Sequence, residues 1–295
     1  MSKRPKGKKK KSILPSLLLV LILLAGLSLL LYPALSDYWN SLHQSQAIAS
    51  YVETVEAMDE ADYEAMWAAA RAYNDALPRD NSRFHPSEEE QAEYDALLDV
   101  SGTGIMGYVE IPQIGVSLPI YHGTDEAVLQ VAIGHIEGSS LPVGGAGTHC
   151  VISGHRGLPS AKLFTDLDQI QEGDTFLLHI LDETLTYQVD QIHIVEPDDV
   201  TYLAIEEGQD LCTLVTCTPY GVNSHRLLVR GRRIETEETA AAIRVTADAI
   251  LVDPMLVAPA VAAPILLILL IWLLVSSRKQ GRKGPARSRD REQEE

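Results

Sequence analysis

A cysteine and an arginine stand at the facing ends of two short apolar segments. The segment 211–216 has the composition of a β-strand and is followed by Cys217, and a second such segment begins at His225 and Arg226. Residues 218–224 between them include proline, glycine and asparagine, which are typical of a turn. We therefore expect the thiol and the guanidinium to lie at the same end of two neighbouring strands. A nearby cation favours thiolate over thiol, and a guanidinium can bind a developing oxyanion.

A histidine able to move protons follows another apolar segment upstream. His155 lies between two glycines in the stretch 153–157, in a turn after a predicted strand, where side chains can enter a cleft. Cysteine, histidine and arginine together can carry acyl transfer through a thioester. The thiol and the imidazole would then titrate as a coupled pair. Taken singly, the cysteine and the histidine each have a structural interpretation as a buried or hydrogen-bonded residue.

The other cysteines and histidines favour structural roles. Cys150 and Cys212 lie inside apolar segments and are expected to be buried as small hydrophobic residues, with a disulfide between them as the alternative. No spacing among the histidines and cysteines supports zinc, so we expect no metal and no cofactor. Three histidines are expected to form hydrogen bonds within the fold: His122, His135 and His149.

The charges divide the chain into basic ends and an acidic middle. The formal net charge is −17 over 295 residues, yet residues 1–12 carry seven basic groups and residues 277–295 carry seven more. The acidic middle would repel nucleic acid, and the basic ends adjoin apolar stretches, where Lys and Arg set topology and meet anionic lipid. We therefore expect a membrane partner and no nucleic-acid partner.

Two apolar stretches, residues 14–35 and 255–275, are long enough to span a membrane. Basic residues flank both on their outer sides, so the positive-inside rule predicts an integral membrane protein with both termini cytoplasmic and residues 36–250 outside the cell. A signal peptide cleaved near residues 34–36 is the alternative to a retained first anchor. A buried core helix is the alternative for the second stretch.

Between these stretches, a helical region precedes a strand-rich one. Apolar residues recur three and four apart over 37–77, which indicates helices, with Asp59 at a helix start. A polar, turn-rich loop over 78–87 and a short helix over 88–98 follow. From residue 104 the pattern changes to short strands with Gly and Pro turns, which favours a closed or nearly closed β-barrel.

The expected elements and boundaries can be stated by residue number. Strands are expected at 106–111, 116–121, 149–153, 175–180, 184–190, 192–195, 211–216 and 225–230, and short helices at 125–130 and 161–170. We expect a basic tail (1–12), a transmembrane helix or signal anchor (13–35), an extracellular helical region (36–103), a catalytic β-barrel (104–235), a linker (236–253), a transmembrane helix (254–276) and a second basic tail (277–295).

The motif Thr213-Leu-Val-Thr-Cys217 resembles the TLxTC signature of sortases, the transpeptidases of Gram-positive cell surfaces. The resemblance covers about residues 40–235, in order and at compatible spacing, and implies a mainly β fold, the eight-stranded sortase-type barrel. The second apolar stretch also resembles class C, the pilin-polymerising branch. Further segments that are similar to class C are 106–112, 118–123, 140–145, 153–159 and 217–226.

The resemblance implies a role for each candidate residue. Cys217 matches the nucleophile, His155 the acid and base, and Arg226 the residue that stabilises the oxyanion. The implied substrate is a pilin or surface protein with an LPxTG-like sorting signal, cleaved between Thr and Gly, and the implied acceptor is a pilin lysine amine. Two alternatives are a sortase that anchors proteins to a peptidoglycan precursor and a non-catalytic surface protein that binds sorting peptides. Thr216 either donates a hydrogen bond to the substrate or only completes the strand.

One loop departs from the family pattern. Many class C enzymes carry a lid with an Asp-Pro-aromatic motif whose ring covers the cysteine. The corresponding loop here reads Arg83-Phe-His-Pro-Ser-Glu-Glu89 and lacks that motif. We expect Phe84 or His85 to cover the thiol instead, the alternative being a local packing role for the aromatic ring.

Overall fold

The N-terminal helix is the first element of the structure, a computed structural model that describes residues 14–79 and 81–235. The described residues divide into two units, one that ends at residue 34 and one that begins at residue 35. Within the first unit the described residues form the apolar start of α1 (Leu14–Glu56). Among the described helices, α1 alone is long and apolar enough to cross a membrane, with a mean hydropathy of 2.6 in its most apolar window. The predicted second span and both basic tails lie outside the described residues.

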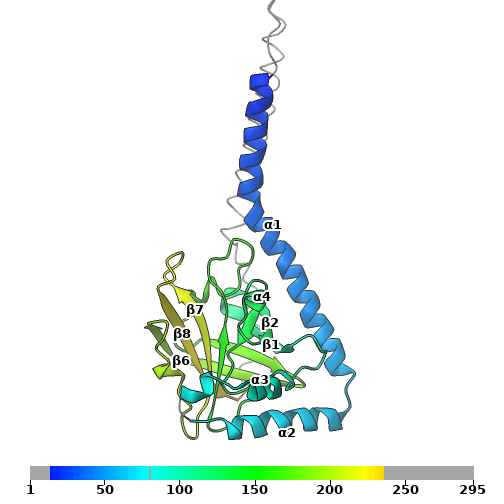
Figure 1. The fold of residues 1–295 in the computed structure, drawn as a ribbon, viewed down its shortest axis with the longest axis vertical. Coiled ribbons are helices and arrows are strands. Elements are labelled where there is room, and N and C mark those ends of the chain that lie inside the picture. Colours follow the sequence, from blue (N-terminus) through cyan, green and yellow to red (C-terminus); the bar gives the residue numbers. More distant parts are fainter. Residues whose placement is uncertain (1–13, 80, 236–295) are drawn as a thin grey trace, which may run out of the picture. The chain divides into compact units, whose positions relative to one another are not determined.

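The predicted helical region after the apolar stretch is confirmed. It comprises the rest of α1 and α2 (Glu60–Ala76), which lies across one end of the barrel (Figure 1). Asp59 occupies the N-cap position of α2, but its side chain makes no capping hydrogen bond. The predicted loop contains the 3₁₀ helix η1 (Asn81–Phe84).

The next helix, α3 (Glu88–Asp95), begins with a capping box between Ser87 and Glu90. It ends before the predicted residue 98. Leu98 has a φ of 58°, in the left-handed region that a continuing α-helix cannot contain. The remaining short helices are η2 (Pro112–Ile114), α4 (Glu126–Leu129), η3 (Leu167–Gln169) and η4 (Thr201–Leu203).

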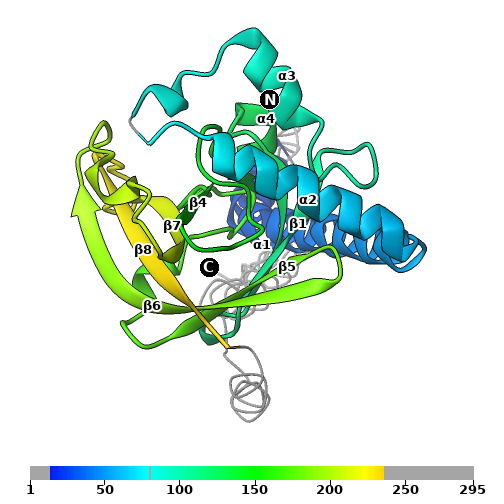
Figure 2. The same ribbon diagram turned by 90° about the horizontal axis from the view of Figure 1, so that it is seen from below.

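Eight strands form a closed barrel in the order β1-β2-β3-β4-β7-β8-β6-β5. Figure 2 shows this barrel from below. The pairs β2–β3 and β4–β7 are parallel, and the others are antiparallel. The strands are β1 (Ile105–Ile111), β2 (Val116–His122), β3 (Ile133–His135), β4 (Thr148–Ser153), β5 (Thr175–Ile180), β6 (Glu183–Val195), β7 (Asp210–Thr218) and β8 (His225–Ile234). The predicted barrel is therefore confirmed.

Three details of the predicted elements are wrong. β3 was not expected, because three residues are too few to show alternation. The segments 184–190 and 192–195 are one strand, β6, whose register shifts between Val189 and Gln191 as in a β-bulge. No α-helix spans 161–170: Leu163 has a φ of 42°, so only the 3₁₀ helix η3 forms there.

Tyr51 fastens α1 to the barrel. Its hydroxyl donates to the Met106 carbonyl at 3.0 Å and accepts from the Leu181 backbone N–H at 2.7 Å. The ring is 2% exposed within the main hydrophobic core, and burial raises the pKa of Tyr51. One side chain thus satisfies backbone groups of β1 and of the turn after β5, so the helix and both barrel segments are held together.

Replacing Tyr51 with Phe should lower the free energy of unfolding by roughly 1–3 kcal/mol, because it leaves a buried carbonyl and a buried N–H without their partner. Denaturant unfolding of the detergent-solubilised protein measures the change. Tyr63→Phe is the matched control: its hydroxyl donates to the Val55 carbonyl, which also accepts from Met58 N, so a smaller loss is expected. Equal losses in the two variants would contradict the bridging role of Tyr51.

Candidate functional site

Cys217 and Arg226 are directly opposite each other on antiparallel strands β7 and β8. Directly opposed residues of such a pair have Cβ atoms about 5 Å apart and project from the same face of the sheet. Both side chains are half-buried at the end of the strand pair, next to the turn 219–224. The structure therefore brings the predicted thiol and guanidinium together at one strand end.

His155 comes to the same strand end through parallel pairing of β4 with β7. Ser153 pairs with Val215, and the next residue, Gly154, donates its N–H to the Val215 carbonyl at 3.0 Å. Two residues beyond this register on each strand are His155 and Cys217. The three predicted residues are thus delivered to one edge of the barrel by three adjacent strands, β4, β7 and β8.

Thr216 supports the loop that carries His155. Its side chain is 1% exposed, and its hydroxyl donates to the Gly154 carbonyl at 2.7 Å. Strand alternation directs Thr216 inward and Cys217 outward. In this structure the hydroxyl therefore contacts the residue before His155. This contact is a structural role for Thr216, distinct from the hydrogen bond to the substrate that was the other prediction.

Arg226 and Arg156 differ in how firmly they are held. The Arg226 guanidinium donates to two carbonyls of its own turn, Asn223 at 3.4 Å and His225 at 3.2 Å. Arg156 forms an ion pair with Asp168 and donates to the Thr218 hydroxyl at 3.3 Å. Arg156 has no role predicted from the sequence, although its position beside His155 was the available signal.

An apolar outer cluster lies on the same face as Cys217 and Arg226. Val215 and Leu228, two residues from the cysteine and the arginine along their strands, belong to it. Phe84 of the predicted lid loop packs against this cluster. The outer cluster comprises Val151, Val195, Leu203, Val215 and Leu228, with Phe84, Ile136 and Val200 packed on it.

The two candidate lid residues therefore lie in different places. Phe84 is half-buried on the outer cluster, and the Arg83 guanidinium stacks 4.4 Å from its ring centroid. Arg83 also donates to the Leu203 carbonyl at 2.7 Å. His85 is exposed and lines a cavity of about 300 Å³ with Tyr73 of α2 and Glu90 of α3.

The surroundings of His155 favour the neutral imidazole. Partial burial lowers its pKa from the ordinary value, and the negative charge of Glu126 opposes this by raising it. His155 therefore stays neutral to a lower pH than a solvated histidine does. A neutral imidazole can accept a proton, and its protonated form can donate one, so the residue suits acid–base work.

The histidines and cysteines expected to be structural are in structural positions. His149 is buried, with one ring nitrogen 2.7 Å from the Ala204 carbonyl and the other 2.7 Å from the Thr213 hydroxyl, and burial lowers its pKa to about 4. His122 and His135 also form hydrogen bonds within the fold. Cys150 and Cys212 are buried free thiols that pair across β4 and β7.

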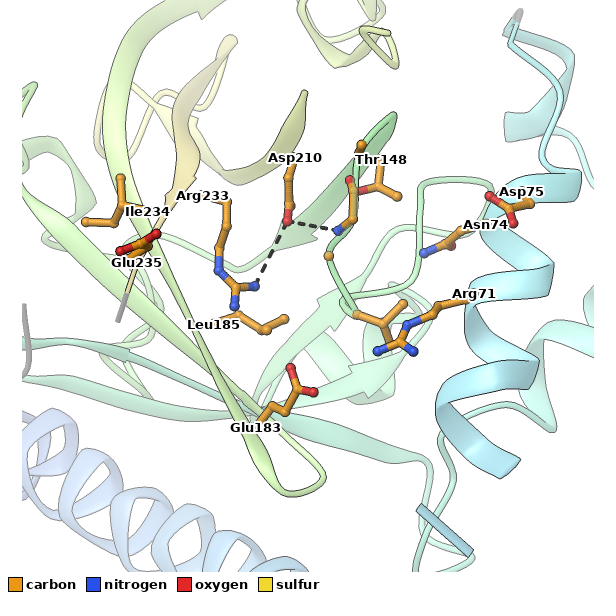
Figure 3. Close-up of a pocket in the computed structure, with 14 residues that line it drawn as sticks. Arg71, Asn74, Asp75, Thr148, Glu183, Leu185, Asp210, Arg233, Ile234 and Glu235 are labelled. Atoms are coloured by element: carbon orange, nitrogen blue, oxygen red, sulfur yellow. Dashed lines mark hydrogen bonds and ion pairs between the residues drawn. The ribbon is translucent and has the colours of Figure 1, made fainter. Parts of the chain in front are cut away.

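A cavity of about 830 Å³ lies away from Cys217, at the opposite ends of the same strands. Thr148 and Asp210, the first residues of β4 and β7, line it (Figure 3). Asp210 accepts hydrogen bonds from Tyr187 at 2.9 Å and Gly145 N at 2.8 Å. Because Cys217 is near the C-terminal end of β7, this cavity is separate from the candidate site.

The chain is similar to known proteins along the barrel and the helices before it. Residues 109–234 match the sortase domain. The crystal structure of sortase C1 from Streptococcus agalactiae is 52% identical, with 65% of this chain and 99% of that chain covered and a TM-score of 0.62. That of sortase C from Streptococcus pneumoniae is 47% identical, with 65% and 97% covered and a TM-score of 0.58.

A curated relative extends the similarity beyond class C. Sortase D of Bacillus subtilis is 30% identical over 131 residues, which cover 43% of this chain and 63% of the relative's length. The motif at the end of β7, the closed barrel and the 52% identity to a nearly fully covered sortase C1 agree with one another. The chain belongs to the sortase family and is a cysteine transpeptidase of class C.

Proposed function

We propose that this transpeptidase polymerises pilins: it cleaves an LPxTG-like sorting signal between Thr and Gly and joins the threonine carbonyl to a pilin lysine amine. The observation that carries the catalytic assignment is the direct pairing of Cys217 with Arg226, beside the loop of His155. The Streptococcus pneumoniae relative is described in terms of its pilin substrate specificity, and another from group B Streptococcus is called pilus-related.

The first half of the reaction forms a thioester. The Cys217 thiolate attacks the threonine carbonyl carbon, and the carbonyl oxygen becomes an oxyanion that the Arg226 guanidinium stabilises by charge-assisted hydrogen bonds. Protonated His155 gives its proton to the glycine nitrogen as the C–N bond breaks. The glycine-side fragment leaves with a free amine, and the threonine acyl group stays on the sulfur of Cys217.

The second half releases the joined product. The lysine amine attacks the thioester carbonyl while neutral His155 accepts a proton from the amine. Arg226 again stabilises the oxyanion. The C–S bond breaks, an amide forms between threonine and lysine, and the thiolate and protonated imidazole are restored. Fixing the three side chains on adjacent strands lowers the entropic part of the barrier, because they need no rearrangement to meet the substrate.

A peptide assay with two acceptors tests the function and separates it from its alternatives. The full-length protein in detergent is given a fluorogenic LPxTG peptide with either a pilin-derived lysine peptide or a peptidoglycan-type amine. We expect Cys217-dependent cleavage and a threonine–lysine amide detected by mass spectrometry. Preference for the peptidoglycan amine would favour cell-wall anchoring. Peptide binding without cleavage, even after deletion of residues 80–87, would favour a binding protein.

We further propose that Phe84 covers Cys217 as a lid. Its support is the packing of Phe84 on the outer cluster, which shares a face with Cys217 and Arg226.

We also propose a membrane arrangement, in which α1 anchors the chain, residues 254–276 form a second span, and both termini are cytoplasmic. We propose the same domain boundaries for this arrangement as those predicted from the sequence. It would hold the barrel where secreted substrates emerge from the cell.

Replacing Arg226 with Ala should lower kcat/KM by roughly 100-fold or more, the usual effect of removing one oxyanion donor. Steady-state cleavage of the fluorogenic peptide measures it. Arg232→Ala is the matched control, because Arg232 is an exposed arginine on the same strand and should leave the rate unchanged. Similar losses in both variants would assign the effect to the charge of β8 and remove Arg226 from the mechanism.

Replacing Phe84 with Ala should raise the rate at which iodoacetamide alkylates Cys217, because less apolar surface would cover the thiol. Mass spectrometry of the modified peptide measures the rate, and Cys150 and Cys212 remain protected by burial. His85→Ala should leave the rate unchanged, since His85 lines the cavity with Tyr73 and Glu90 and is not among the residues packed on the outer cluster. An unchanged rate in Phe84→Ala would sink the lid role of that residue.

Replacing Glu126 with Gln should lower the pKa of His155 further, because the carboxylate that raises it is removed while burial remains. Histidine NMR across a pH titration measures the shift. Asp125→Asn is the control, as it neutralises the adjacent acid. The same shift in both variants, or none in Glu126→Gln, would show that Glu126 does not set the protonation of His155.

A further inference from the structure

We propose that Asp37 and Asn40 of α1 are positioning residues for His155, through hydrogen bonds to the loop that carries it. The inference rests on the proposed catalytic role of His155. Both residues lie in the unit that contains the barrel, just after the apolar stretch of α1. They are separated by more than 100 residues from the backbone groups that they bind.

The contacts are side chain to backbone and come from one face of the helix. Asp37 accepts the Lys162 backbone N–H at 2.6 Å, and Asn40 donates to the Ser160 carbonyl at 2.8 Å. Residues three apart lie on the same helix face, so the two side chains reach neighbouring groups of one loop. Both are half-buried. One loop acceptor and one loop donor are therefore satisfied by α1.

The turn that connects the Lys162 bond to the backbone of His155 contains a strained residue. Leu163 has a φ of 42°, a conformation that a non-glycine side chain disfavours. Its neighbours on both sides are held: Lys162 N bonds Asp37, and Phe164 N donates to the His155 carbonyl at 3.1 Å. Strained residues persist where the surroundings over-determine them. The bond to Asp37 is thus one of the constraints on this turn.

The loop is fastened to the barrel at its other end. The Thr216 hydroxyl of β7 donates to the Gly154 carbonyl. Within the loop, the Thr165 hydroxyl accepts the Gly157 N–H at 3.1 Å. His155 therefore lies between an attachment to β7, the strand of Cys217, and an attachment to α1. A displacement of the loop at its contacts with α1 would be transmitted through Phe164 to His155. Small displacements of a catalytic group lower the reaction rate by large factors.

The test compares variants of the full-length protein. Asp37→Ala, Asn40→Ala and the double variant should lower kcat for LPxTG peptide cleavage by roughly ten-fold, a part of what a misplaced catalytic group can cost, with KM little changed. The pH limb that depends on His155 should shift as well. Asp37→Asn should restore much of the rate, because its amide oxygen can still accept the Lys162 N–H.

Gln44→Ala is the matched control. Gln44 also joins α1 to the barrel by a side chain to backbone bond, at 2.6 Å, but its partner is the Val131 carbonyl in a different loop. It should therefore leave kcat and the pH profile near those of the wild type. Thermal unfolding of each variant shows how far the fold is loosened by losing one such bond.

Two results would overturn the inference. One is a wild-type kcat and pH profile in the double variant. The other is an equal fall in Gln44→Ala, which would assign the effect to general loosening of α1. Failure of the proposed function looks different: wild-type protein would then cleave the peptide without dependence on Cys217 or His155, or not at all, and the positioning role would fall with it.

Discussion

The candidate site depends on the register of β4, β7 and β8. Alternation along β7 sends Cys212, Leu214 and Thr216 into the barrel, and Val215 and Cys217 to the outer face. A slip of one residue would exchange these sets and bury the thiol in the core. The same register sets Arg226 opposite Cys217 and brings the end of β4 alongside. The proposed chemistry and the packing of the core are therefore fixed by one set of backbone hydrogen bonds.

Polar groups on the outer face reinforce this register. Thr213 pairs with Arg230 across β7 and β8, and its hydroxyl contacts the ring of His149 on β4. Arg230 in turn binds Asp190 of β6 at 2.8 Å and Glu206 of the β6–β7 loop at 2.8 Å. His149, Thr213 and Arg230 are buried, whereas Glu206 is exposed, and each buried polar side chain has a hydrogen-bond partner, as a network that specifies one arrangement requires. Here it joins strands β4, β7, β8 and β6 and the loop between β6 and β7.

Much of this site could be predicted from the sequence, and the remainder could not for identifiable reasons. Cys217 and Arg226 are joined by a short turn, so local pattern alone suggested their pairing. The adjacency of β4 and β7 is not local, since their paired residues are 62 apart, so the residue pattern suggested His155 as a partner but not the strand order that brings it to Cys217. The left-handed Leu163 and the bond from Asp37 to Lys162 leave no periodic signal, because they arise from tertiary packing.

The departure of the lid loop from the family motif has a physical counterpart in Arg83. Its guanidinium stacks on Phe84 and binds the Leu203 carbonyl, while its own carbonyl lies where a Cβ on Gly138 would stand. Any side chain at residue 138 would therefore push the loop outward. Under the proposed lid role, the closed position would depend on an arginine, a ring and this close backbone approach, with no Asp-Pro pair required. Substrate entry would then have to displace Phe84 from the outer cluster. The free-energy cost would come from exposing apolar surface rather than from breaking an ion pair.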